Sequence, residues 1–441
     1  MRYTHHIFVL LVSLSGFAKG AQDSSDSKTP PAGFSALWNG RDLAGWWGAG
    51  TEDPRKYMNL PPADFKTKLD ASLNDIRQHW SVVDGELVND GKGLFLTTEK
   101  YYGNFELLVD YKTVALADSG IYLRGCPQVQ IWDSTDPSKH AIGADKGSGG
   151  LWNNTADAPG KNPLVKADKP FAQWNHLRII IVGSRVWVWL NDQPTVTGAV
   201  LENHFDRNQP VPSRGPIQLQ THGGEIRWRN LFIREINSDE ANQRLRGTDA
   251  GEFKSVFNGK DFTGWAGPLD CAAVVDSTLV WQPGKSGTIY TQEEFKNFVL
   301  RLEFKLPPGG NNGLAIRYPG EGNPAYVGMC ECQVLDDGYE LATGNKIDLR
   351  QAHGSAYGMV AAHRGFHHPV GDWNYQEVTV NGSTIKVELN GVKILDADLS
   401  KVSDFMDGSA HPGKDRTSGH FGLAGHNDPV TFRNMSIKPL D

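Results

Sequence analysis

The chain has 441 residues, more than a single ordinary domain contains, so two or three domains are expected. Its content of 39% hydrophobic and 22% charged residues is that of a folded protein and excludes a largely disordered chain. The formal net charge of -7 and the lack of a long basic run argue against nucleic acid as a partner. The 49 Gly, 24 Pro and 13 Trp favour an all-β protein with many turns.

The N-terminus has the three parts of a secretory signal peptide. A polar start (MRYTHH) precedes a short apolar run (IFVLLVSLSGF) and small residues suited to cleavage (AKGA). The run is shorter than the ~20 residues of a spanning helix, so no membrane span is expected after residues 1–21 are removed. We therefore expect a periplasmic or secreted protein, with residues 22–33 as a disordered spacer.

Short segments with period-two alternation follow over residues 34–236. They predict strands divided by Gly, Asn and Pro turns: FELLVDY, GIYLR, VQIW, LRIIIV, RVWVWLND, IQLQT and IRWRNLFIREI. One amphipathic helix is predicted over residues 66–78, within an extra segment from Thr51 to His79 that is suited to wall or cover a cleft. Many strands with few helices indicate a two-sheet sandwich.

Residues 253–440 repeat this pattern in the same order. FSALWNGRDLAGWWG returns as FKSVFNGKDFTGWAG, DSGIYLR as NNGLAIR, and QVQIWD as ECQVLDD. A duplication of this length means two structural domains and not a solenoid, whose repeats are roughly 20–50 residues long. The predicted fold is therefore all-β, with two tandem jelly-roll sandwiches joined by a polar linker at 237–252.

The four cysteines are too few for a disulfide framework. Cys330 and Cys332 share one face of a predicted strand with Val334, which places them in the core. A bridge from Cys271 to one of them stays open for an exported protein.

Alternation also predicts which side chains leave the core. In GIYLR and QVQIW, the aliphatic residues point inward, so the residues between them share the opposite face. The predicted outward set in the first domain is Tyr122, Arg124, Gln128, Gln130, Trp132, Gln218, Gln220 and His222; in the second it is Arg317, Glu331, Gln333 and His426. Amides, a guanidinium and aromatic rings suit sugar hydroxyls and ring faces, whereas the alternative is a solvated sheet face.

These motifs resemble those of the DUF1080 family, described as 3-keto-disaccharide hydrolases or 3-keto-glucoside 1,2-lyase/3-keto-2-hydroxy-glucal hydratases. The resemblance rests on five motifs that occur in the same order in each copy: FxxL(W/F)NG(K/R)DLxGW, (N/D)SGIxLR, EVQIxD, LQxHG and RNIxI. It covers nearly all of the chain after residue 33. It implies a concanavalin A-like sandwich and cleavage of 3-keto-glucosides or 3-keto-disaccharides. It also implies a functional link to a sugar 3-dehydrogenase.

The two copies depart from the family pattern at different positions. The first has Gln128 where the family has Glu, but keeps Ser119, Gly120, Arg124, Gln130, Asp133 and His222. The second keeps Arg317, Glu331, Gln333 and Asp336, but has Asn312 in place of Ser and carries His426 in AGHND. Trp152 of the first copy stands where the second has Tyr357. Which copy is catalytic stays open.

The implied reaction is an elimination. A ketone at C3 acidifies the C2 hydrogen, so a base can remove it while the C1 oxygen leaves, and a cation stabilises the enolate. In the second copy, Glu331 or His426 would be base or acid, with Arg317 on the enolate and Asp336 and Gln333 orienting the sugar. In the first copy, the corresponding groups would be His222, Asp133 and Arg124. The remaining substrate-binding candidates are Tyr122, Gln128, Gln130, Trp132, Trp152, Gln218, Gln220 and Tyr357.

No cofactor is expected. A divalent metal would be an alternative enolate stabiliser, but the spacing of Asp133, Asp136, His140 and Asp145 matches no metal motif. The rival functions are a lectin-like binding protein and an ordinary glycoside hydrolase. The latter needs two carboxylates, for which only Glu331 and Asp336 are candidates.

Overall fold

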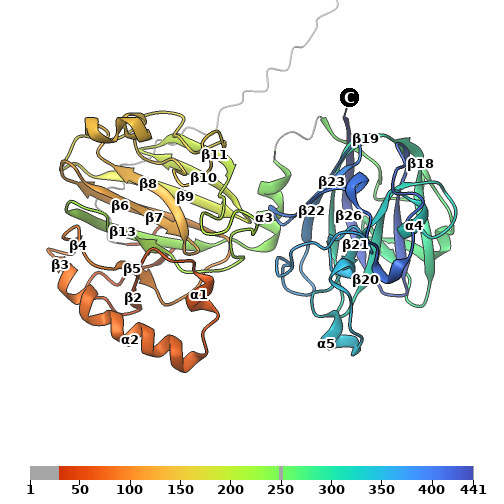
Figure 1. Ribbon diagram of the computed structural model, residues 1–441, viewed down its shortest axis with the longest axis horizontal. Helices are drawn as coiled ribbons and strands as arrows, with labels where there is room; N and C mark the ends of the chain where they lie inside the picture. Colours follow the sequence, from red (N-terminus) through yellow and green to blue (C-terminus); the bar gives the residue numbers. More distant parts are fainter. Residues whose placement is uncertain (1–28, 248–251, 441) are drawn as a thin grey trace, which may run out of the picture.

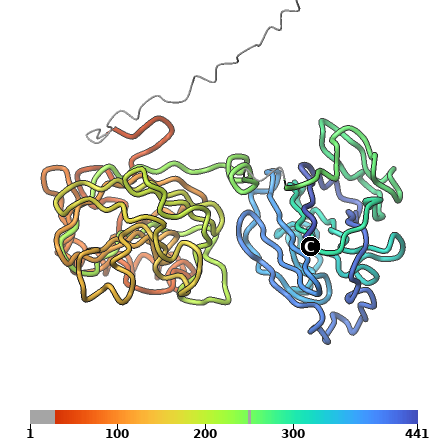
Figure 2. The backbone as a smooth tube through the Cα atoms, turned by 90° about the horizontal axis from the view of Figure 1, so that it is seen from above, coloured from red at the N-terminus to blue at the C-terminus, as the bar shows by residue number. Residues whose placement is uncertain are grey.

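The computed structural model describes residues 29–247 and 252–440. The predicted signal peptide and residues 22–28 of the predicted spacer lie outside the described residues. Two β-sandwiches lie side by side with a short helix between them (Figure 1). The view from above also shows two separate bodies with this helix at their junction (Figure 2). The prediction of two tandem all-β sandwiches is confirmed.

The first sandwich consists of an eight-stranded and a five-stranded antiparallel sheet. The larger sheet runs in the order β11 (Gln193–Val200), β10 (Arg185–Leu190), β9 (Asn175–Val182), β6 (Phe105–Thr113), β13 (Ile226–Glu235), β4 (Glu86–Asn89) and β3 (Trp80–Val83), and β1 (Ser35–Ala36) pairs with β13. The smaller sheet runs in the order β2 (Trp46–Ala49), β5 (Phe95–Thr98), β12 (Gln218–Leu219), β7 (Asp118–Leu123) and β8 (Cys126–Trp132).

The second sandwich repeats this topology strand for strand. Its larger sheet runs in the order β24 (Val392–Asp398), β23 (Thr384–Leu389), β22 (Asn374–Asn381), β19 (Asn297–Lys305), β26 (Thr431–Leu440), β17 (Thr278–Trp281) and β16 (Ala272–Val275), and β14 (Lys254–Ser255) pairs with β26. Its smaller sheet runs in the order β15 (Trp265–Ala266), β18 (Ser286–Phe295), β25 (Gly419–His426), β20 (Asn311–Tyr318) and β21 (Cys330–Leu335).

The core of each sandwich lies between its two sheets. Ile121, Leu123 and Val129 are fully buried there, as the alternation predicted. Cys330 and Cys332 also lie in the core, as predicted. All four cysteines are buried free thiols, so Cys271 forms no bridge.

The insertion in the first sandwich is helical. The predicted helix at 66–78 is observed as α2 (Pro62–His79), preceded by α1 (Arg55–Met58). Helix α2 packs on β2, where the Ser72 hydroxyl accepts a hydrogen bond from the Gly48 amide. In α1, the Tyr57 ring lies edge-on to Trp47 at 5.2 Å. The insertion therefore covers the β2 edge of the five-stranded sheet.

The remaining helices are short. They are α3 (Ser238–Arg246), α4 (Pro324–Val327), α5 (Tyr339–Thr343) and the 3₁₀ turns η1 (Pro137–Ile142), η2 (Ala144–Lys146), η4 (Leu269–Cys271), η5 (Leu349–Gln351), η6 (Leu399–Lys401) and η7 (Met406–Gly408). Within the described ranges, no helix is both long and apolar enough to cross a membrane.

Helix α3 forms within the segment predicted to be a linker. The Asn237 side chain caps it by accepting from the Glu240 amide, which satisfies a donor that the first turn leaves open. From this helix, Asn242 donates to the Trp373 carbonyl and Arg246 donates to Glu303 at 2.5 Å. Because both acceptors belong to the second sandwich, α3 docks the two domains against each other.

Glu303 is the buried centre of this junction. Its side chain is 1% exposed and accepts from Arg246, Arg433 at 2.7 Å and Asn434 at 3.0 Å. Breaking a buried ion pair leaves an uncompensated charge, which costs roughly 3–5 kcal/mol. We therefore expect Glu303→Gln to lower the free energy of unfolding by about 3 kcal/mol in urea denaturation.

The matched control is Asp239→Asn. Asp239 also pairs with Arg433, but its side chain is 77% exposed. An exposed pair contributes at most about 1 kcal/mol, so this variant should remain close to the wild type. Equal effects of the two variants would show that Glu303 does not hold the junction.

Candidate functional site

The five-stranded sheet of each sandwich has a polar face turned away from the core, named here the polar face. It is built by β8, β7 and β12 in the first domain and by β21, β20 and β25 in the second, which are neighbours in each sheet. Gly120 is paired with Gln130 and Gly313 with Gln333, so the two copies share one register. The predicted residues on these strands are therefore brought together.

In the second sandwich, the polar face carries a carboxylate–histidine pair. Glu331 is buried, and its Oε1 lies 3.6 Å from Nε2 of the half-exposed His426. The Glu331 carboxylate raises the pKa of His426 above its ordinary value. Both residues line a cavity of about 360 Å³, together with Tyr290, Tyr318 and Asn323. A proton acceptor and a proton donor thus face one space.

A glycine lets this carboxylate lie flat across the neighbouring strand. A Cβ on Gly313 would be 2.1 Å from Glu331 Oε1, closer than any real contact. A Cβ on Gly120 would likewise be 2.3 Å from Gln128 Oε1. The glycine of the SGI motif therefore shapes the site as well as the strand.

The first sandwich carries a different network. Gln128 donates to Gln130 Oε1 at 2.5 Å, and Gln130 donates to Asp118 Oδ1 at 2.8 Å. The other oxygen of Asp118 lies 2.7 Å from Lys139 Nζ and 3.0 Å from His222 Nδ1. Burial acts to raise the pKa of Asp118, but hydrogen bonds from these two cations hold it below its usual range. The hydrogen bond to Asp118 in turn raises the pKa of His222.

The prediction that His222 pairs with Asp133 is therefore wrong, because its partner is Asp118. By register, Asp118 corresponds to Asn311 and Gln128 to Glu331. Each copy thus keeps one carboxylate beside an equivalent histidine. The carboxylate comes from β7 in the first copy and from β21 in the second. The sequence analysis missed Asp118 and Lys139. A signal for Asp118 was present in the sequence. The first copy has Asp118 and Gln128 where the second has Asn311 and Glu331, so the carboxylate changes position between the copies.

Asp133 and Asp336 are turned toward main-chain amides and away from the polar face. Asp133 accepts from the amides of Leu116 at 2.9 Å and Thr135 at 2.7 Å. Asp336 accepts from the amides of Gly309 at 2.8 Å and Gly338 at 3.1 Å. Both carboxylates stabilise the turns that follow β8 and β21, so their predicted part in catalysis has no geometric support.

Arg124 and Arg317 lie at the ends of β7 and β20 with left-handed backbone, at φ values of 55° and 48°. Their side chains turn away from the polar face and are almost fully buried. Arg124 donates to the carbonyls of Gly103 and Pro212, and Arg317 donates to three main-chain carbonyls: Lys296, Gly382 and Arg416. Burial lowers the pKa of both guanidinium groups. The prediction that they stand beside the substrate is wrong, since the left-handed backbone breaks the alternation.

Tyr122, Trp132 and Gln218 lie on strands that build the polar face, and Trp152 and Tyr357 lie in loops next to these strands. The rings of Trp132 and Trp152 are 6.0 Å apart, and Tyr122 lies 5.3 Å from Phe95. The Tyr357 hydroxyl accepts from Gln351 at 3.0 Å. Gln218 donates to Thr97. Three carbonyl oxygens on the two faces are buried with no partner in the described part of the chain: those of Gln128, Gln220 and Gln333.

Two of the aspartates that follow β8 are held by neighbouring groups. Asp133 and Asp136 are engaged as turn caps, the latter by the Ser138 amide and hydroxyl. Among residues 29–247 and 252–440, no group of three or more His, Cys, Asp or Glu side chains converges as a metal ligand set.

The fold and the site together define a two-sheet β-sandwich protein that carries a histidine–carboxylate pair in a polar cavity. The chain belongs to the family of the 3-keto-alpha-glucoside-1,2-lyase-like domain, whose sequence profile matches residues 33–234 and 252–438. The two matched segments coincide with the two sandwiches, so the chain is built from two copies of that domain.

A 3-keto-disaccharide hydrolase of Bacteroides thetaiotaomicron is 27% identical over 251 residues, which cover 48% of this chain and 86% of that protein. Two crystal structures of proteins proposed to be glycosyl hydrolases, both from Parabacteroides distasonis, are also similar. One is 25% identical with a TM-score of 0.39 and covers 44% of this chain and 96% of its own. The other is 28% identical with a TM-score of 0.38 and covers 43% and 99%.

The buried arginine can be tested in the second domain. Arg317→Met removes the donors to three main-chain carbonyls, and a buried acceptor left unpaired costs about 1–3 kcal/mol. We expect the free energy of unfolding in urea to fall by at least about 3 kcal/mol. The exposed Lys386→Gln serves as control. Unchanged stability with lost turnover would restore the catalytic role that the sequence suggested.

Proposed function

We propose that the second sandwich cleaves 3-keto-glycosides by elimination at C2 and C1, followed by hydration. The observation that carries this proposal is the Glu331–His426 pair in the cavity of the polar face. The family supports the substrate class, and the geometry supports the choice of domain.

The two side chains suit the two proton transfers of the reaction. Glu331 removes the C2 proton, and the electron pair forms the C1–C2 double bond as the C1–oxygen bond breaks. The protonated His426, which the neighbouring carboxylate favours, gives its proton to the leaving oxygen. The product is a 3-keto-2-hydroxy-glucal. Water then adds a hydroxyl to C1 and a proton to C2, which releases the 3-keto sugar.

The walls of the cavity provide positioning. The Tyr290 and Tyr318 rings lie 5.5 Å apart edge-to-face and offer apolar surface to a pyranose ring. Gln333 donates to Asn311 at 2.7 Å, while its carbonyl oxygen has no donor among the described residues. That oxygen is buried behind the residues that line the cavity, so Gln333 supports the polar face without reaching the open space.

Ordinary glycoside hydrolysis fits this cavity less well. That reaction uses two carboxylates on either side of the bond. Glu331 supplies the one carboxylate of the described residues that line the cavity. Asp336, the second candidate from sequence, is held by main-chain amides.

The first sandwich is proposed to bind carbohydrate without cleaving it. The carboxylate beside its histidine, Asp118, is held by both Lys139 and His222, which weakens it as a base. The lectin-like role proposed for this half rests on this weakened base and on the aromatic rings of Trp132 and Trp152, which lie 6.0 Å apart.

Two further parts of the proposal rest on sequence and chemistry. The N-terminal pattern supports export to the periplasm or beyond. The ketone at C3 has to be installed before elimination, so an enzyme of the sugar 3-dehydrogenase class would supply the substrate.

The assignment of the active domain is tested by two matched variants. Removing a general base typically costs 10²–10⁴-fold in rate, so Glu331→Gln should lose roughly that factor on a 3-keto-glucoside. Asp118→Asn should stay within about threefold of the wild type. Turnover is measured by mass spectrometry of the glucal and 3-keto sugar, with the unoxidised glucoside in parallel. Loss in Asp118→Asn alone would move catalysis to the first domain, and cleavage of the parent glucoside would indicate ordinary hydrolysis.

The ionisation of His426 provides an independent test. The Glu331 carboxylate stabilises the imidazolium, so the acid form persists above the ordinary pKa of about 6.5. Activity that needs this acid is retained as the pH rises past 6.5 and is lost above the raised pKa. An NMR titration should show the pKa of His426 falling toward 6.5 in Glu331→Gln. The same pKa in both proteins would contradict the pairing.

A further inference from the structure

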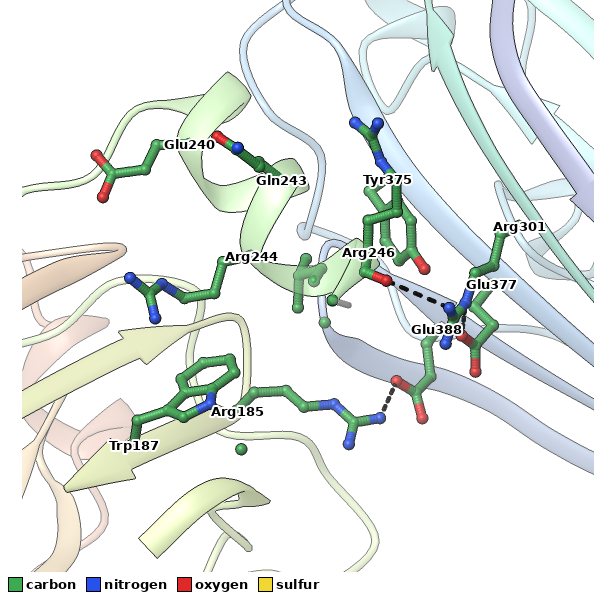
Figure 3. A pocket seen from close by; sticks show the side chains of 14 residues that line it. Arg185, Trp187, Glu240, Gln243, Arg244, Arg246, Arg301, Tyr375, Glu377 and Glu388 are labelled. Carbon is green, nitrogen blue, oxygen red and sulfur yellow. Dashed lines mark hydrogen bonds and ion pairs between the residues drawn. The ribbon is translucent and has the colours of Figure 1, made fainter. Parts of the chain in front are cut away.

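A second cavity, distinct from the polar faces, opens between the two sandwiches. It has a volume of about 810 Å³ and is lined by helix α3 and by strands of both larger sheets (Figure 3). Domain interfaces are a preferred place for small-ligand sites, and this volume falls within their usual range of about 300–1,000 Å³.

Most charges of this cavity are already paired. Arg185 reaches across the interface to Glu388 at 2.7 Å, and Arg301 donates to Glu377 at 2.7 Å. The third lining glutamate, Glu240, is held by Arg234 at 2.6 Å. The lining carboxylates therefore have no need of a cation from outside.

Arg244 is the exception. It projects from α3 alongside Trp187, with the guanidinium carbon 5.4 Å from the centre of the indole (Figure 3). It forms no ion pair with any described residue, and its Nε is buried without an acceptor there. With four arginines and three glutamates in the lining, the cavity retains one positive charge in excess, centred on this side chain.

We propose that this cavity binds an anionic sugar, with the negative group on Arg244 and the pyranose ring against Trp187. A guanidinium forms two parallel hydrogen bonds with a carboxylate or phosphate. An indole offers an apolar face to the C–H side of a sugar ring. A ligand held this way contacts both domains, since Tyr375 and Glu377 line the opposite wall.

Calorimetric titration at fixed ionic strength tests the site. The probes are digalacturonate, glucose 6-phosphate, cellobiose and sodium sulfate. At least one charged sugar should bind, and cellobiose should bind at least tenfold more weakly. The tighter of digalacturonate and glucose 6-phosphate identifies whether carboxylate or phosphate carries the charge. Arg244→Gln should weaken that binding by roughly tenfold or more, the usual effect of losing a charge-assisted contact. Trp187→Ala should weaken it by up to about tenfold, because the apolar ring contact is lost.

Matched controls separate the site from its surroundings. Trp189 is also half-buried and lies two residues along β10, stacked on Arg178 outside the cavity, so Trp189→Ala should leave binding unchanged. Arg214→Gln, at a 59% exposed arginine, serves as the charge control. Circular dichroism confirms that each variant is folded.

The inference is overturned if neither charged sugar binds, if Arg244→Gln and Trp187→Ala bind like the wild type, or if sulfate binds as tightly as the sugars. Glu331→Gln should retain full binding, which makes this test independent of the proposed catalysis. Loss of binding in Glu331→Gln would place the ligand in the catalytic cavity and refute a second site.

Discussion

Each sandwich depends on one desolvated guanidinium at the end of the strand next to the β8 or β21 edge of its smaller sheet. Arg317 links the start of β19 and the β22–β23 turn of the larger sheet to the chain entering β25 in the smaller one. Arg124 joins the equivalent places through Gly103, Pro212 and the Asn104 side chain. A buried cation is tolerated only when its donors are satisfied, so it ties the two layers to one separation. The buried arginine thereby fixes the smaller sheet, and with it the polar face. The side chains of the polar face take no part in this link between the sheets.

The two copies share this fold but differ in the position of one carboxylate on the polar face. Asp118 on one strand and Glu331 on the next reach equivalent histidines from different directions. Glu331 faces an open cavity and pairs with one histidine, whereas Asp118 is also neutralised by Lys139. The two domains can therefore have the same fold and the same residue types but different reactivity, because the pairing of the carboxylate decides whether it can accept a proton.

The junction of the domains follows a similar principle. Glu303 is buried because three donors surround it, one of which comes from α3. Helix α3 is thus both the connection and part of the interface. The other side of α3 carries Arg244. The neighbouring charges pair with one another, so the positive charge of Arg244 has no paired carboxylate in the described lining of the cavity. The excess positive charge of the cavity between the two sandwiches therefore comes from the helix that joins them.

The sequence alone determined the fold class, the duplication, the core residues and most of the polar face. Those features follow from period-two alternation and repeated turn motifs, which are local properties of the chain. The alternation failed at Arg124 and Arg317. Their left-handed backbone at the strand end directs the side chain away from the face that the alternation predicts. Such a backbone reversal leaves no signature in hydrophobic pattern.

Only the tertiary structure decided which charges meet. Asp118 and His222 are far apart in sequence, as are Glu303 and Arg246, and their pairing depends on strand order. Asp133 directly follows the QVQIW motif in the chain, yet its carboxylate accepts hydrogen bonds from main-chain amides and does not pair with His222. Composition and motifs therefore supply the chemical groups of the site. The antiparallel register and the turn geometry decide which of them face a ligand, because hydrogen bonding in the folded chain uses up the rest.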